Sequence, residues 1–176
     1  VMREIAAEYK RGRVLDIVTT NIDAARPVSW NIGRIALHDT PEALQLIRDV
    51  MLASSSLPAI FPPVMFEVQA GGQRYDEMHV DGGVKAQLFL RGFMLDFEET
   101  LEEAGVKGKV GASLYVIRNG RPGEERPRKI VSASSLSIAS ATINSVFTLS
   151  TDSSLFRAYV LAKRNNIDYN LAAIPD

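Results

Sequence analysis

The segment Glu77-Met-His-Val-Asp81-Gly82-Gly83 ends an alternating stretch, and its last three residues are an aspartate and two glycines. Such alternation predicts a β-strand, so Asp81 is expected at the end of a strand and Gly82-Gly83 in the tight turn that follows. Glycine allows the backbone to adopt positive φ and allows a second chain segment or a ligand to approach closely. An aspartate in this position either forms the turn with its own side chain or serves as a catalytic carboxylate.

Two segments upstream accompany this motif, namely Ala53-Ser-Ser-Ser-Leu-Pro-Ala-Ile-Phe-Pro-Pro-Val64 and Thr19-Thr-Asn-Ile-Asp-Ala-Ala-Arg-Pro-Val-Ser-Trp30. Taken together, the three segments resemble the patatin-like phospholipases, a family of serine lipid acyl hydrolases. In that family an A-S-x-x-x-P-x-x-F-P-P-V-type segment precedes a D-G-G or D-G-A motif. The resemblance covers about Thr19 to Gln87, and a weaker similarity continues through Leu114-Tyr-Val-Ile-Arg-Asn-Gly120.

The resemblance implies an α/β fold with three layers, α/β/α, and a mostly parallel central sheet between the helices. It also implies a Ser–Asp catalytic dyad, in which Asp81 takes the proton of a serine with no histidine between them and Gly82 and Gly83 support the turn. The implied substrate is a lipid or phospholipid acyl ester, met through transient contact with a membrane surface, and the implied chemistry uses no cofactor or metal. The alternative is a non-catalytic binding or structural domain that retains the fold.

The hydrophobic pattern by itself also predicts interleaved helices and strands, and therefore the α/β class. Thr40-Pro41-Glu42 is a strong helix start, because threonine caps a helix and proline suits its first position. The expected helices are residues 2–11, 31–38, 41–53 and 88–104, with one or two more after Val131; the expected extended segments are residues 14–20, 26–30, 64–69, 74–80, 110–117 and 167–172. The run of residues 14–20 has the apolar, β-rich composition of a strand that is buried on both faces.

A nucleophile for acyl transfer is normally signalled by G-x-S-x-G, and the chain contains no such motif. The nearest match is Gly111-Ala-Ser113-Leu-Tyr115, where tyrosine replaces the second glycine. Ser113 would also lie at the start of a strand, whereas a nucleophile elbow lies at the end of one. We therefore expect residues 1–176 to be the C-terminal part of a single patatin-like domain, with the nucleophilic serine upstream and no activity in the isolated chain. Such a part would leave a sheet edge and apolar faces uncovered, which favours self-association, most simply as a homodimer.

Several other residues are candidates for the site. The chain has two histidines, His38 and His79, and His79 is the second choice of base because it shares a strand face with Asp81. Glu77, His79 and Asp81 alternate along one strand, which fits a polar strand face better than a metal site. Ser54, Ser55 and Ser56 either bind free carbonyls at a helix end or line an acyl pocket, and the apolar stretch that begins at Phe61 suits core packing better than an acyl groove.

The composition limits the remaining function classes. With 20 basic and 21 acidic residues the net charge is −1, so there is no general electrostatic attraction for nucleic acid. The absence of cysteine excludes disulfides, a thiol nucleophile and thiolate metal ligands. No apolar run reaches the ~20 residues of a membrane span, and no signal peptide is recognised. The basic cluster within residues 118–129 is interspersed with proline and glutamate, which favours a solvated loop over an anion or headgroup site.

Overall fold

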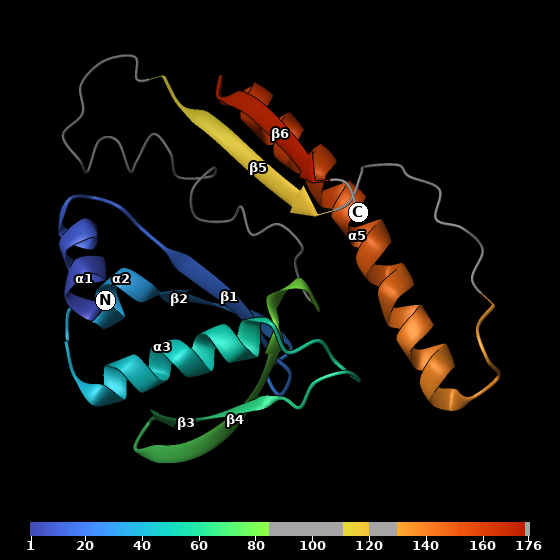
Figure 1. Cartoon of the computed structure of the whole chain (residues 1–176), viewed down its shortest axis with the longest axis horizontal. Helices are drawn as coiled ribbons and strands as arrows, with labels where there is room; N and C mark the ends of the chain where they lie inside the picture. Colours follow the sequence, from blue (N-terminus) through green and yellow to red (C-terminus); the bar gives the residue numbers. More distant parts are fainter. Residues whose placement is uncertain (85–110, 120–129, 175–176) are drawn as a thin grey trace. The chain divides into compact units, whose positions relative to one another are not determined.

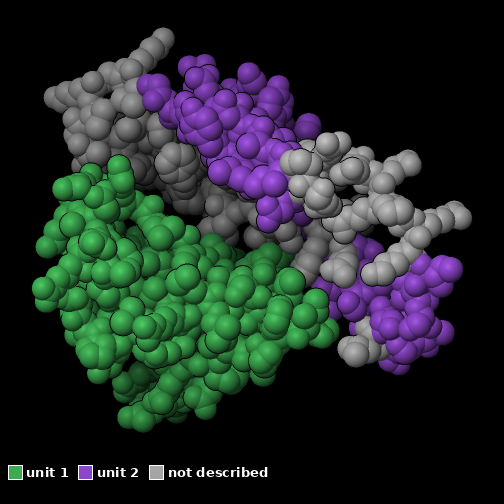
Figure 2. All heavy atoms as spheres, viewed as in Figure 1, with its two compact units in different colours: residues 1–87 green, residues 88–176 purple. Residues whose placement is uncertain are grey.

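The computed structural model describes residues 1–84, 111–119 and 130–174. The chain divides into two compact units, Val1–Gln87 and Leu88–Asp176 (Figure 2). The expectation that residues 1–176 belong to one domain stays a prediction, and each unit is described by itself.

The first unit pairs a four-stranded sheet with three helices (Figure 1). Its elements are α1 (Met2–Lys10), β1 (Asp16–Asn21), β2 (Arg26–Asn31), α2 (Ile32–Ala36), α3 (Pro41–Ser54), β3 (Val64–Ala70), β4 (Gln73–Asp81) and a 3₁₀ turn (Gly82–Val84). The strand order is β2-β1-β4-β3, and every neighbouring pair is antiparallel. The α/β class is confirmed. The expected mostly parallel sheet is wrong for this unit, because both its hairpins and the junction between them run antiparallel.

Local sequence signals account for where the elements of this unit begin and turn. Thr40 caps α3 through a hydrogen bond from the Ala43 amide to its hydroxyl, 3.2 Å long, as its sequence predicts. The turn between β3 and β4 consists of Gly71 and Gly72, both at positive φ. That conformation suits a two-residue hairpin turn and favours glycine at both positions. The two glycines thus join β3 to β4 as a hairpin, in which Ala70 pairs with Gln73.

The core of the first unit lies between α3 and one face of the sheet. Along α3, one face carries the buried residues Ala43, Ile47, Val50 and Ala53. Phe66 of β3 belongs to the same buried cluster, and Trp30 packs against it. On β3 this face carries Phe66 together with the half-buried Val64 and Val68.

The strand predicted at residues 14–20 differs from its expected burial. Val14 and Leu15 are 63% and 54% exposed and precede β1, which begins at Asp16. Consecutive burial, which requires cover on both faces, occurs only over Thr19, Thr20 and Asn21. The apolar run alone could not reveal this, because burial on both faces depends on which segments cover the strand.

The second unit contains β5 (Ser113–Asn119), α5 (Ser135–Arg164) and β6 (Asp168–Ile174). The two strands pair in parallel, and the C-terminal part of α5 lies beside them (Figure 1). Ala162 and Ile167 form the buried centre, against which Leu114 and Tyr169 pack. The residues after Val131 thus form one long helix rather than two. The predicted helix 88–104 and most of the basic loop 118–129 lie outside the described residues.

Candidate functional site

Asp81 is the last residue of β4, as its sequence predicts. It is half-buried, and its cross-strand partner is Thr19 of β1. Its backbone N–H donates to the carbonyl of Ser56 over 3.0 Å. Its carboxylate Oδ1 accepts a hydrogen bond from the Gly83 N–H over 2.7 Å. This last bond spans two residues and forms an Asx turn, so Asp81 has the turn-forming role that is one of its two expected roles.

The environment of Asp81 makes its carboxylate a stronger base than a solvated aspartate. Burial raises the pKa of Asp81 above 3.8, and the hydrogen bond from Gly83 lowers it by less. Among the described residues, no cation forms an ion pair with Asp81. A carboxylate that is partly desolvated and not neutralised by a cation accepts a proton more readily, which is what a general base requires.

Of the two roles expected for the glycines after Asp81, close approach is found at Gly82 and positive φ at neither. Both glycines lie in the 3₁₀ turn, and neither uses the positive φ that glycine allows. Residue 82 must be glycine because it lies very close to the backbone of β1 at Val18. A Cβ at this position would overlap the carbonyl oxygen of Val18 and lie 2.9 Å from its carbonyl carbon. The second chain segment that the glycine admits is therefore β1.

The serine run lies at the end of α3 and contacts the end of β4. Ser54 and Ser55 donate to the Met51 carbonyl, each over 3.0 Å, and Ser56 donates to the Leu52 carbonyl over 2.8 Å. These bonds favour the first interpretation, in which the serines bind free helix carbonyls. Ser56 is buried and meets Asp81 through its backbone carbonyl, and no described hydroxyl forms a hydrogen bond with the Asp81 carboxylate.

The apolar stretch after the serines separates into exposed and buried parts. Phe61 is 54% exposed, so the expectation of core packing is wrong for this residue, whereas Phe66 is 6% exposed and belongs to the core. Phe61 closes a tight turn, in which its N–H donates to the Leu57 carbonyl over 3.0 Å.

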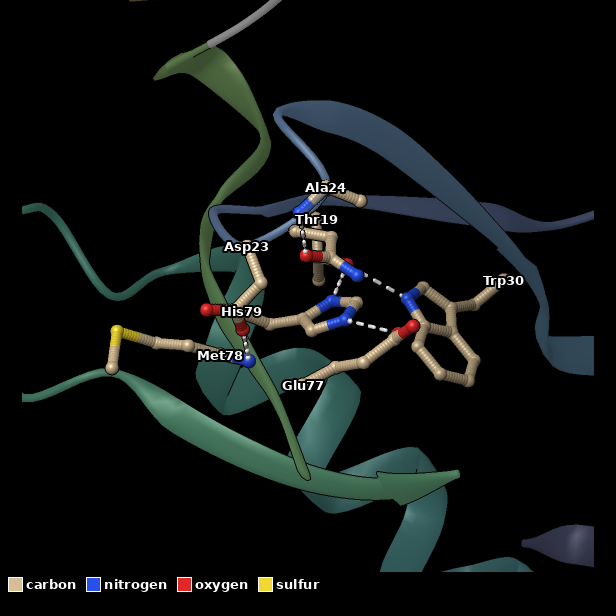
Figure 3. Close-up of polar contacts among 8 residues, drawn as sticks. Thr19, Asp23, Ala24, Trp30, Glu77, Met78 and His79 are labelled. Carbon is tan, nitrogen blue, oxygen red and sulfur yellow. Dashed lines mark hydrogen bonds and ion pairs between the residues drawn. The ribbon is translucent and has the colours of Figure 1, made fainter. Parts of the chain in front are cut away.

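His79 is fully buried, and both its ring nitrogens have partners (Figure 3). Nδ1 lies 2.8 Å from the Thr19 hydroxyl, and Nε2 lies 3.3 Å from Oε2 of Glu77. Trp30 donates its indole N–H to the same Thr19 hydroxyl over 2.8 Å. The ring of His79 also packs edge-on against Phe66, with 4.8 Å between centroids. A base in this setting cannot reach a substrate, so the geometry does not favour His79 as the alternative general base.

The remaining candidates from the sequence, Ser113 and His38, lie outside β4. Ser113 is the first residue of β5 in the second unit, as predicted, and it is exposed. His38 is exposed just after α2. Within the described ranges, no group of three His, Asp or Glu side chains could hold a metal ion. In the same part of the chain, no helix has the length and apolar character needed to cross a membrane.

Thr19 and Asn21 lie in one of the three segments that carry the family resemblance, but no role was assigned to them from sequence. Asn21 is fully buried and pairs with His79 across the strands. Its Oδ1 accepts from the Ala24 N–H over 2.8 Å, while its Nδ2 has no hydrogen-bond partner among the described residues. The usable signal was the period of two along β1, which places Thr19 and Asn21 on one face.

The chain matches no protein-family model, no curated protein and no solved structure.

Replacing Asp81 with Asn is expected to raise the free energy of unfolding at about pH 7, and this advantage should vanish by about pH 3. Because burial raises the pKa of Asp81, the folded protein binds a proton there more readily than the unfolded chain. The stabilising contribution of this carboxyl is therefore complete below its unfolded pKa and is lost as the pH rises through the folded pKa. Asn is neutral throughout, and its Oδ1 can still accept from Gly83.

Urea unfolding of both proteins at the two pH values measures the difference. Asp76→Asn, on the exposed part of β4, controls for the loss of one surface charge. An Asp81→Asn effect of equal size at both pH values would contradict the expectation.

Proposed function

We propose that this chain supplies the aspartate of a Ser–Asp dyad in a lipid acyl hydrolase of the phospholipase A or esterase type. The observation that carries the proposal is the state of Asp81: it ends a strand, is partly desolvated and has a raised pKa, and no described cation neutralises it. The motif resemblance to the patatin-like phospholipases supplies the reaction class. The three-layer α/β/α arrangement of that family is part of the same proposal.

In this mechanism a serine hydroxyl, supplied by a segment that precedes Val1, binds to Asp81 and attacks the ester carbonyl. Asp81 accepts the hydroxyl proton as the bond to the carbonyl carbon forms, and it returns this proton to the leaving alcohol as the ester C–O bond breaks, which leaves an acyl-enzyme. A water molecule then attacks the acyl-enzyme, its proton passes through Asp81 to the serine oxygen, and the free acid leaves. The Asx turn is compatible with this role. Gly83 occupies Oδ1, and a carboxylate has further lone pairs on Oδ2 for the incoming hydroxyl.

Ester hydrolysis tests the proposal. The chain of residues 1–176 is expected to show no turnover of p-nitrophenyl esters or phospholipid vesicles above background, because a carboxylate alone provides neither a covalent route nor donors for an oxyanion. The same chain extended by the coding sequence upstream of Val1 is expected to hydrolyse both. Turnover by residues 1–176 that disappears in Ser113→Ala would identify Ser113 as the nucleophile and reject the upstream serine.

A second candidate function is a non-catalytic binding or structural domain, and one observation favours it. The Asx turn and the Ser56 contact give Asp81 a structural role that needs no chemistry. The extended protein distinguishes the two candidates, since a non-catalytic domain hydrolyses no ester in either form.

A further inference from the structure

The position of Asp81 depends on a short junction between two hairpins. The β1–β2 hairpin has six residue pairs and the β3–β4 hairpin has seven, whereas β1 and β4 share only three. Asp81 takes part in the last of these three pairs, opposite Thr19. A slip or splay of this junction therefore moves Asp81 directly, even if both hairpins stay intact.

A chain of hydrogen bonds that is buried at Thr19 and His79 crosses this junction on the face that carries Asp81. It runs from Trp30 on β2 through Thr19 on β1 to His79 on β4, and then to Glu77 on the same strand (Figure 3). The Thr19 hydroxyl accepts from the indole, so we assign its own proton to Nδ1 of His79. The other ring nitrogen then carries the histidine proton and donates to Glu77.

Burial makes this chain of hydrogen bonds specific for one arrangement of the strands. Thr19 and His79 are both 0% exposed, so water cannot replace a bond that breaks there. A buried donor or acceptor without a partner is unfavourable, which penalises any shift of β4 along β1. Directly opposed residues share one face of the sheet, and so do residues two apart on a strand. Thr19 and His79 therefore both flank Asp81.

We propose that Thr19 and His79 are positioning residues, which hold the end of β4 on β1 and thereby set the direction of the Asp81 carboxylate. Trp30 supports them by supplying the donor that orients the Thr19 hydroxyl. The catalytic consequence rests on the proposed Ser–Asp function. The geometric part of the proposal, namely that Thr19 and His79 set the direction of the Asp81 carboxylate, does not rest on that function. It can be tested in residues 1–176 alone.

Nuclear magnetic resonance tests the geometric part. The readouts are the ring nitrogen resonances of His79 and the pH titration of the Asp81 carboxyl carbon.

Thr19→Val keeps the branched shape and removes the hydroxyl, and it is expected to shift both readouts. Thr19→Ser restores the hydroxyl and should restore both. Val50→Ala, which opens the core without removing a member of the chain of bonds, should shift neither. Trp30→Phe removes only the indole donor to Thr19, and it replaces Thr19→Val as the test variant if Thr19→Val does not fold.

A shift of the His79 resonances in Thr19→Val with an unchanged Asp81 titration would overturn the inference. In the protein that carries the nucleophilic serine, Thr19→Val is expected to lower kcat/KM by about 10- to 100-fold, the scale of a misplaced catalytic group. Thr19→Ser and Val50→Ala should stay close to the parent. Full activity in Asp81→Asn would instead reject the Ser–Asp function, and the Asp81 titration would still decide the positioning role.

Discussion

Asp81→Asn is expected to lower ester hydrolysis by the serine-containing protein by ~10²–10⁴-fold, the usual contribution of a general base. Asn is nearly isosteric with Asp, and its side-chain oxygen can keep the bond from the Gly83 N–H. The substitution therefore removes the proton acceptor and leaves the turn in place. The loss should appear in kcat as well as kcat/KM, because proton transfer belongs to the transition state and not to substrate binding.

The measurement is steady-state hydrolysis of a p-nitrophenyl ester, with circular dichroism to verify the fold. Asp76→Asn is the matched control, since it makes the same chemical change on the same strand at an exposed position. It should retain the parent rate. Undiminished activity in Asp81→Asn would remove Asp81 from the mechanism. His79→Gln would then be the next variant, although the burial of His79 argues against a direct catalytic role.

Gly82→Ala is expected to destabilise the first unit by about 1–3 kcal/mol or to prevent its folding, the range for overpacking a close contact. The added Cβ would overlap the Val18 carbonyl oxygen, and it would lie 3.2 Å from the Val18 Cβ. The main obstacle is backbone, which cannot rotate away as a flexible side chain can. Relief of the overlap would require β1 and the end of β4 to separate at their three-pair junction.

Urea unfolding gives the free energy for this comparison. Gly111→Ala is the control, because its Cβ would meet nothing within 4 Å and its φ is not positive. The control should unfold like the parent. A Gly82→Ala protein as stable as the parent would show that the end of β4 can move away from Val18, and it would weaken the case for a rigidly held Asp81.

Features that depend on neighbouring residues in the chain were predictable from sequence. Thr40 and Pro41 specify the start of α3, and Gly71-Gly72 specify the hairpin turn, because each acts on the backbone within a few residues. The alternation before Asp81 likewise placed this carboxylate at a strand end. In the second unit, helical spacing predicted a helix at α5 despite its many serines and threonines.

Features that depend on pairing between distant segments were decided only by the tertiary structure. Local patterns do not encode strand direction, so the antiparallel β1–β4 junction was not foreseen. The same junction buries His79 beside Thr19 and thereby removes a candidate base from solvent. The junction also explains why residue 82 is glycine: a Cβ there would overlap Val18, whereas its φ is not positive. The sequence by itself thus determined which residue carries the carboxylate and on what element it lies. The tertiary structure determined its surroundings, because burial and cross-strand contacts arise only when segments some sixty residues apart come together.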